Sequence, residues 1–253
     1  MKTSLFLIAV SVLAVTTACS KKAGDPATST AAASANSTPT VAVTAPASGD
    51  WSEAVAPTAA GGFVMGSPDA KVKLVEYGSL TCPHCSEFEK VGAKPLIDNY
   101  VRSGKVSWEF RNFVRDPYDL AASLVSRCNG AKSFFGLTRA LYSSQKDWVG
   151  KLQTIPQAQM EALQAMPPAQ QFSAIGKMTG FPQFAAQRGV PAAKAEACLA
   201  DTKQVDRLVQ MNSDAVSQYN IPGTPSFLIN GTLLPDTATW ETLEPKLKTA
   251  LAG

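Results

Sequence analysis

The sequence has little of what metal and haem sites require, with one histidine and five cysteines among 253 residues. Because it holds a single Cys-x-x-Cys pair, it lacks the ligands for a His-rich metal site or a four-ligand zinc module. Charge is also sparse, since 17% of the residues are charged and the net charge is +3. We therefore expect no metal site and no nucleic-acid partner.

Long apolar runs are absent except near the N-terminus, where residues 5–15 (LFLIAVSVLAV) follow Lys2. This run has the length of a signal-peptide core and is shorter than the ~20 residues that span a bilayer. Residues 1–18 are therefore predicted to be an export signal. Cys19 follows directly, and the junction resembles the lipobox of bacterial lipoproteins, although Thr16 stands where that motif prefers leucine. The resemblance implies a lipid on Cys19; the alternative is an ordinary signal-peptidase cut nearby.

The segment after the signal has a different composition from the rest of the chain. Residues 23–60 contain 28 Ala, Ser, Thr or Pro among 38 residues, so there is almost nothing to bury. We predict a disordered spacer over residues 19–61 and a folded domain over residues 62–253.

The folded part begins with a strand, a helix and a second strand. Residues 71–77 and 106–110 show the alternation of half-buried strands, and the helix between them is expected to kink at Gly92 and Pro95. This order predicts a βαβ unit with two parallel strands.

The remainder of the folded part reads mostly as helix. Residues 117–200 carry helical signals without a convincing strand, and a longer amphipathic helix follows at 205–219. A strand is predicted at 226–230, with a hairpin turn at Asn230-Gly231 and a C-terminal helix over 240–251.

The tetrapeptide Cys82-Pro83-His84-Cys85 lies where the first strand meets the first helix. Pro83 suits a first helical turn, which places Cys82 at the helix N-terminus, where free N–H groups favour a thiolate. His84 can stabilise the anion further, and Cys85 would be the resolving thiol. Because a stabilised thiolate is a good leaving group, the disulfide of this pair would be an oxidant.

Three other readings of the tetrapeptide compete with this one. A zinc knuckle needs a second ligand pair, whereas Cys128 and Cys198 are single and far apart. An inert structural disulfide is possible in an exported protein. A haem attachment site would need histidine after the second cysteine, and that residue is Ser86.

Three segments together resemble the DsbA-like branch of thioredoxin-fold thiol oxidoreductases. They are the strand at residues 74–79 (LVEYGS), the Cys-Pro-His-Cys tetrapeptide and Gly223-Thr224-Pro225. The resemblance covers residues 62–253 and implies an α/β thioredoxin fold with a helical subdomain inserted at about residues 117–200.

The resemblance also implies roles for individual residues. Cys82 is the nucleophile and Cys85 its partner in a redox-active disulfide. Pro225 is the cis-proline beside them, the alternative being an ordinary trans-proline at a strand start. The backbone of Thr224 pairs with an extended substrate peptide.

Glu76 lies on the strand that leads to Cys82. In the family an acid at this position lies beneath the disulfide and assists proton movement, and burial would raise its pKa. The alternative is a carboxylate solvated at a sheet edge.

Cys128 and Cys198 lie in or beside the predicted insertion. In an oxidising compartment this remaining pair is expected to form a structural disulfide, as occurs in some DsbA-like proteins. The alternative is two buried free thiols.

These features predict a thiol:disulfide oxidoreductase of the bacterial periplasm, lipid-anchored to the membrane and needing no cofactor. Its expected partners are reduced exported proteins and a DsbB-like, quinone-linked membrane protein that reoxidises it. The alternatives are a disulfide reductase or isomerase, or a non-catalytic lipoprotein binding module with a structural Cys-x-x-Cys.

Overall fold

The computed structural model describes residues 44–253 of the chain. The predicted export signal at residues 1–18, the lipid on Cys19 and the first part of the spacer lie outside the described residues. Within the described range, no helix combines the length and the apolar character that a membrane crossing requires.

A six-stranded mixed sheet forms the centre of the described part, in the order β1-β2-β4-β3-β5-β6. The strands are β1 (Val55–Pro57), β2 (Phe63–Met65), β3 (Val72–Gly78), β4 (Val106–Asn112), β5 (Ser226–Ile229) and β6 (Thr232–Leu233). β3 and β4 are parallel, which confirms the predicted βαβ pairing, and the other neighbouring strands are antiparallel. The three-residue strands β1 and β2 were not predicted, because segments this short carry no clear alternation.

The helical segments fall into three groups along the chain. Those between β3 and β4 are α1 (Pro83–Phe88), η2 (Glu89–Ala93), α2 (Lys94–Leu96) and η3 (Ile97–Val101). Between β4 and β5 lie α3 (Pro117–Arg127), α4 (Ala131–Ser143), α5 (Gln145–Gln153), α6 (Gln157–Gln164), α7 (Pro168–Thr179), α8 (Phe181–Ala186), α9 (Ala192–Leu199) and α10 (Thr202–Tyr219). The short 3-10 helix η1 (Trp51–Glu53) precedes β1, and α11 (Trp240–Ala252) follows β6.

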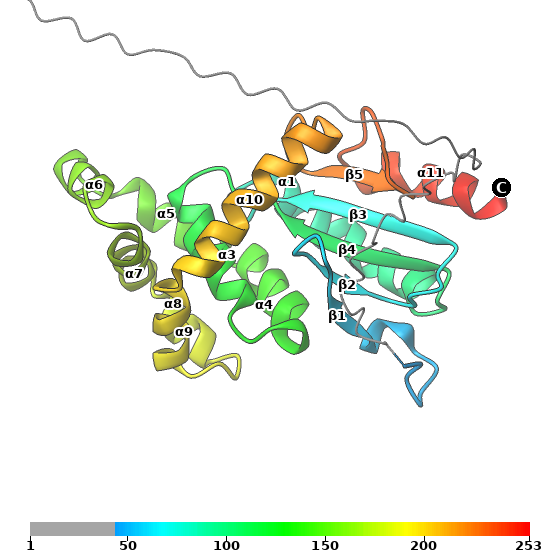
Figure 1. Ribbon diagram of the computed structural model, residues 1–253, viewed down its shortest axis with the longest axis horizontal. Helices are drawn as coiled ribbons and strands as arrows, with labels where there is room; N and C mark the ends of the chain where they lie inside the picture. The colour runs from blue at the N-terminus through cyan, green and yellow to red at the C-terminus, as the bar shows by residue number, and fades with distance from the viewer. Residues whose placement is uncertain (1–43) are drawn as a thin grey trace, which may run out of the picture. The chain divides into compact units, whose positions relative to one another are not determined.

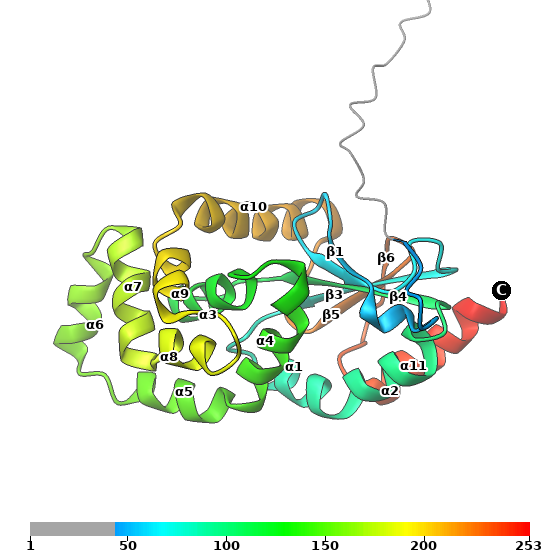
Figure 2. The same cartoon turned by 90° about the horizontal axis from the view of Figure 1, so that it is seen from below.

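Helices α3 to α9 fill the stretch that the sequence assigns to a helical subdomain, and they lie together to one side of the sheet (Figure 1). α10 then returns to the sheet. It covers one face, where Ala215 packs against Val75 and Tyr77, while α1 and α11 lie on the opposite face (Figure 2). The buried side chains Leu74 and Leu243 belong to the core on that second face.

The helical path from residue 83 to residue 101 contains two wide π-helical turns, η2 and η3. They flank Pro95, whose ring and missing N–H disrupt regular α-helical bonding. Gly92 is required for packing, because a Cβ there would lie 2.8 Å from a ring carbon of Phe88 and 3.1 Å from Cβ of Trp240. The predicted irregularity near Gly92 and Pro95 therefore appears as π turns within one continuous helical path.

The hairpin that joins β5 to β6 is the one predicted at Asn230-Gly231. Both residues have positive φ, 49° and 84°, as a tight hairpin with this dipeptide requires.

The predicted boundary between spacer and domain at residue 61 is wrong. Residues 51–57 already form η1 and β1, and β1 pairs with β2. Asp50 caps η1 and pairs with Arg102 at 2.8 Å, while Ala54 and Ala56 are buried. The Ala/Pro-rich composition gave no strand signal for this segment. Its alanines are buried because β1 pairs with the sheet, and their own weak hydrophobicity would not have predicted this.

The disulfide between Cys128 and Cys198 is present, so the alternative of two free thiols is wrong. Cys128 directly follows α3 and Cys198 lies in α9, with their Cα atoms 5.6 Å apart across 70 residues of sequence. The bond therefore ties the first and last helices of the insertion together.

Replacing both cysteines of this bond, Cys128→Ser with Cys198→Ser, should lower the free energy of unfolding by about 2–5 kcal/mol, because the unfolded chain gains freedom. Urea unfolding of the parent and the double variant measures the difference. Strong reduction provides the control, since it should make the two proteins equally stable. Equal stability before reduction would contradict a stabilising role for the bond.

Candidate active site

The Cys-x-x-Cys pair lies at the junction of β3 and α1, as predicted. Cys82 is the N-cap of α1, with extended backbone (φ −82°, ψ 120°), and Pro83 occupies the first helical position. No side-chain hydrogen bond caps this helix, so its first N–H groups are available to the Cys82 sulfur. Cys82 and Cys85 are both free thiols, so the described structure corresponds to the reduced form of the pair.

The surroundings of Cys82 strongly stabilise its thiolate. They lower its pKa from 9.0 to about 4, mainly through a hydrogen bond from the Cys85 thiol. The Thr224 side chain and the backbone N–H groups of Cys85 and His84 add to this effect, while burial opposes it. These N–H groups belong to the N-terminus of α1, which the sequence analysis predicted to lie beside the Cys82 sulfur.

The described structure shows His84 acting on Cys82 through its backbone, and a role for its imidazole stays a prediction. Its side chain is exposed, and none of the hydrogen bonds found among residues 44–253 involves its imidazole. Its part in stabilising Cys82 comes from its backbone N–H.

Cys85 is fully buried and has the opposite chemical character. Burial, followed by the nearby Cys82 sulfur, raises the pKa of the Cys85 thiol well above its usual range. The two sulfurs therefore differ: Cys82 favours the anion and Cys85 favours the protonated thiol.

The loop before β5 brings Thr224 and Pro225 to the cysteines across 142 residues of sequence. The Thr224-Pro225 peptide bond is cis, which confirms that prediction. The Cys82 sulfur lies 3.2 Å from the carbonyl oxygen of Thr224, to which it donates a hydrogen bond when it is protonated.

Glu76 is buried in the central strand β3, so the alternative of a solvated carboxylate at a sheet edge is wrong. Burial, with a smaller contribution from Glu89, raises the pKa of Glu76 well above its usual range. The Trp108 indole N–H donates to its carboxylate at 3.1 Å. The strand pattern marked Trp108 as a core residue, but nothing in the sequence showed that its indole serves Glu76.

Sequence reasoning also missed three buried polar side chains that the insertion directs at residues 79–82. They are Asp119 of α3, Tyr142 of α4 and Gln145 of α5, and all three form hydrogen bonds to that loop. A lone polar residue within a helical pattern gives no indication of its partner, so these contacts have no sequence signal.

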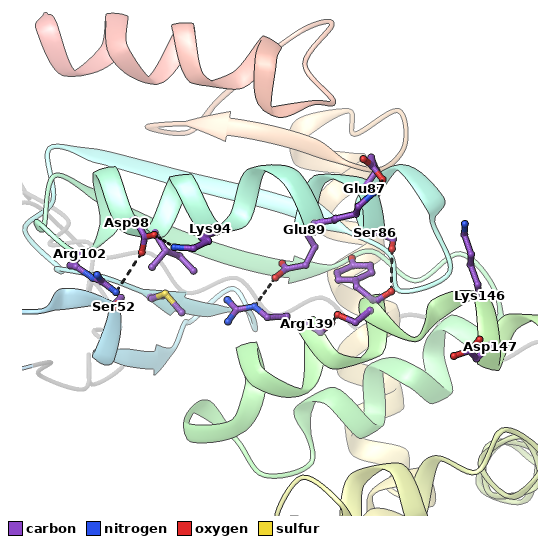
Figure 3. Close-up of a pocket in the computed structure, with 15 residues that line it drawn as sticks. Ser52, Ser86, Glu87, Glu89, Lys94, Asp98, Arg102, Arg139, Lys146 and Asp147 are labelled. Carbon is purple, nitrogen blue, oxygen red and sulfur yellow. Dashed lines mark hydrogen bonds and ion pairs between the residues drawn. The ribbon is translucent and has the colours of Figure 1, made fainter.

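A groove of about 990 Å³ runs along the insertion side of the helical path from α1 to η3 (Figure 3). Ser86, next to Cys85 in sequence, lies in its wall, but the two cysteines do not. Arg139 of α4 crosses the groove to Glu89 of η2 at 2.9 Å, which connects the insertion to the helix that carries the cysteines.

Cys128 and Cys198 are bonded to each other, so they are not available as the second ligand pair of a zinc knuckle. In the part of the chain that the structure describes, no three His, Cys, Asp or Glu side chains are grouped to hold a metal ion.

Comparison with known proteins agrees with this geometry. A family model described as Thioredoxin matches residues 58–249. The crystal structure of a protein-disulfide isomerase from Novosphingobium aromaticivorans is 37% identical, with a TM-score of 0.72, and the match covers 75% of this chain and 97% of that one. The alpha-DsbA1 of Wolbachia pipientis shares the fold at 22% identity and a TM-score of 0.62, over 78% of this chain and 94% of that one.

A curated relative from Rickettsia bellii, named "Putative protein-disulfide oxidoreductase", is 28% identical over 170 residues. That match covers 67% of this chain and 57% of the relative, so the chain spans little more than half of the relative's length. The chain therefore belongs to the thioredoxin family.

Proposed function

We propose that this protein introduces disulfide bonds into exported client proteins by exchange at Cys82 and Cys85. The observation that carries the proposal is the stabilised Cys82 thiolate at the uncapped N-terminus of α1. Because a thiolate exists only in the reduced form, stabilising it favours reduction of the enzyme and so makes its disulfide an oxidant. The 37% identical protein-disulfide isomerase of Novosphingobium supports thiol–disulfide chemistry in general.

The exchange proceeds in two steps. A client thiolate attacks the Cys82 sulfur, the Cys82–Cys85 bond breaks, and Cys85 leaves with an electron pair and takes up a proton. The client's second thiolate then attacks the client sulfur of the mixed disulfide, and Cys82 leaves as the stabilised thiolate. The client loses two electrons to form its disulfide, and the enzyme gains them.

The proton for Cys85 has a nearby source in Glu76. Burial keeps the Glu76 carboxyl protonated over a wider pH range, and its charge acts on the Cys85 thiol. In the proposed reaction Glu76 therefore donates to the leaving Cys85 sulfur and recovers the proton when the disulfide reforms.

The proposal places the enzyme in the periplasm, held by a lipid on Cys19 and separated from the membrane by the spacer. Electrons leave the reduced pair through a DsbB-like, quinone-linked membrane protein. The Ala/Ser/Thr/Pro-rich composition of residues 23–50 supports this arrangement, because a spacer of this composition would let the domain reach both partners.

A second candidate is disulfide isomerisation, which the name of the Novosphingobium protein favours. An isomerase uses the same Cys82 nucleophile but attacks existing client disulfides in its reduced form. A binding module with an inert Cys-x-x-Cys is disfavoured, because an inert disulfide has no need of a stabilised thiolate.

Two measurements test whether the protein acts as an oxidase: equilibration of the Cys82–Cys85 pair with glutathione, and the rate at which the protein oxidises a reduced dithiol peptide. We expect a strongly oxidising pair and rapid peptide oxidation, with Cys82→Ala lowering the rate by at least about 10³-fold. Cys85→Ala cannot form the redox disulfide, so it should not oxidise the peptide, and with oxidised glutathione it should accumulate a mixed disulfide between Cys82 and glutathione. A potential near that of thioredoxin, about −270 mV, would refute the oxidase. If the protein rearranged scrambled disulfides faster than it oxidised the reduced peptide, the result would favour the isomerase. A Cys82–Cys85 disulfide that did not react would favour the binding module.

The reduced protein should gain stability over the oxidised protein as pH rises from about 4 to about 9. In that range Cys82 binds a proton when unfolded but not when folded, so raising the pH favours the folded reduced state, by up to about 1.4 kcal/mol per pH unit. The contribution is complete above the unfolded pKa and is lost as pH falls through the folded one. Urea unfolding of both forms across this range measures the difference, and a difference independent of pH would contradict the stabilised thiolate.

Growth with a labelled fatty acid tests the anchor. The parent should incorporate label and fractionate with membranes, and Cys19→Ala should lose both properties. Cys82→Ala is the matched control and should keep them. Label that persists in Cys19→Ala would refute lipidation at that residue.

A further inference from the structure

The turn that leads from β3 into α1, residues 79–82, has most of its polar groups bonded to the helical insertion. Only one bond within the turn is made by its own backbone, from the Cys82 N–H to the Ser79 carbonyl at 3.1 Å. Asp119, Tyr142 and Gln145 of the insertion supply most of the other partners, so the insertion acts on the segment that fixes the position of Cys82.

Asp119 of α3 makes the densest set of these contacts. Its fully buried carboxylate accepts from the Ser79 hydroxyl at 2.6 Å, from the Leu80 N–H at 2.8 Å and from the Arg115 N–H at 3.0 Å. Two of these donors belong to the turn before Cys82, and the third fixes the entry to α3.

Gln145 of α5 holds the carbonyl groups of the same turn. Its buried side-chain amide donates to the Leu80 carbonyl at 2.8 Å and to the Cys82 carbonyl at 3.0 Å. The Cys82 carbonyl also accepts the first backbone bond of α1, from Ser86. Gln145 thus fixes the peptide that starts the helix.

We propose that Asp119, assisted by Gln145, is a positioning residue for thiol–disulfide exchange: from the insertion it holds residues 79–82 so that the Cys82 sulfur stays at the N-terminus of α1. The helical insertion would then set the oxidising strength of the pair through its hydrogen bonds to residues 79–82. This inference rests on the proposed exchange chemistry at Cys82 and Cys85.

The Asp119 carboxylate is most effective when ionised, since three donors point at it. Burial raises its pKa to about 7. The titratable side chains whose charges act on it or respond to it are Asp116, at the start of the same helix, and Tyr142 of α4.

The substitution Asp119→Asn has two effects on the oxidising strength of the cysteine pair, and they have opposite signs. The direction of the measured change therefore shows whether the positioning or the charge of Asp119 matters more. At about pH 8 the substitution removes a nearby negative charge, which by itself would stabilise the Cys82 thiolate and make the pair more oxidising. Loss of positioning has the opposite effect, because an amide nitrogen cannot accept the N–H of Arg115 or Leu80. We expect the equilibrium constant for oxidation of glutathione to fall about tenfold, with a smaller change at about pH 6, where Asp119 is protonated.

Gln145→Leu is the second variant, because it loosens the same turn without changing charge. It should weaken the oxidant in the same direction at both pH values, and the two substitutions together should be less than additive. The matched control is Ser126→Ala, which removes a buried hydroxyl from α3 that bonds only within its own helix. The Ser126→Ala substitution should lower the free energy of unfolding and leave the equilibrium constant for oxidation of glutathione unchanged.

The proposal would be overturned if both variants lost stability but kept the parent's equilibrium constant for oxidation of glutathione. It would also be overturned if the Asp119→Asn variant were more oxidising than the parent. This test compares each variant with the parent, so it can be read whatever reduction potential the parent's Cys82–Cys85 pair has. Failure of this inference can therefore be distinguished from failure of the oxidase proposal, which depends on the parent's own value.

Discussion

The uncapped N-terminus of α1 sets the chemistry of the cysteine pair, and the strands and helices around it hold that helix end in place. A helix normally satisfies its first N–H groups with a capping side chain. Here the N-cap residue is Cys82 itself, and no side-chain bond occupies those groups. Pro83 starts the helix without adding another donor. The N–H groups are therefore left for the sulfur, and its thiolate is stabilised.

Burial gives the two sulfurs different properties. Cys85 lies one turn inside the core, where the loss of water penalises its anion, while Cys82 remains at the helix end. Beneath them, the central position of β3 buries Glu76 between two neighbouring strands, and the Trp108 indole is its one hydrogen-bond donor found among the described residues. A carboxyl held in this way is suited to exchanging a proton with a buried thiol.

The insertion is coupled to this centre at several points along its length. Asp119 and Gln145 reach the turn before α1, and Arg139 pairs with Glu89 on the following π turn. The disulfide joins the end of α3, the helix that carries Asp119, to α9, so it anchors that helix within the insertion. The insertion is therefore part of the active-site framework as well as a cover over one end of the sheet.

The local features could be predicted from the amino-acid sequence: the Cys-Pro-His-Cys helix start, the βαβ order, the Asn230-Gly231 turn and the helical stretch at 117–200. Each of these depends on neighbours within a few residues, which periodicity and turn chemistry report directly. Resemblance to a family added the pairing of Cys128 with Cys198 and the cis bond before Pro225. Three features became visible only in the folded chain: the Trp108 indole donates to Glu76, Asp119 holds the turn at Ser79, and residues 55–57 pair with β2. Hydrophobic patterns indicate which side chains are buried, whereas the partner of a buried polar group depends on how distant segments pack.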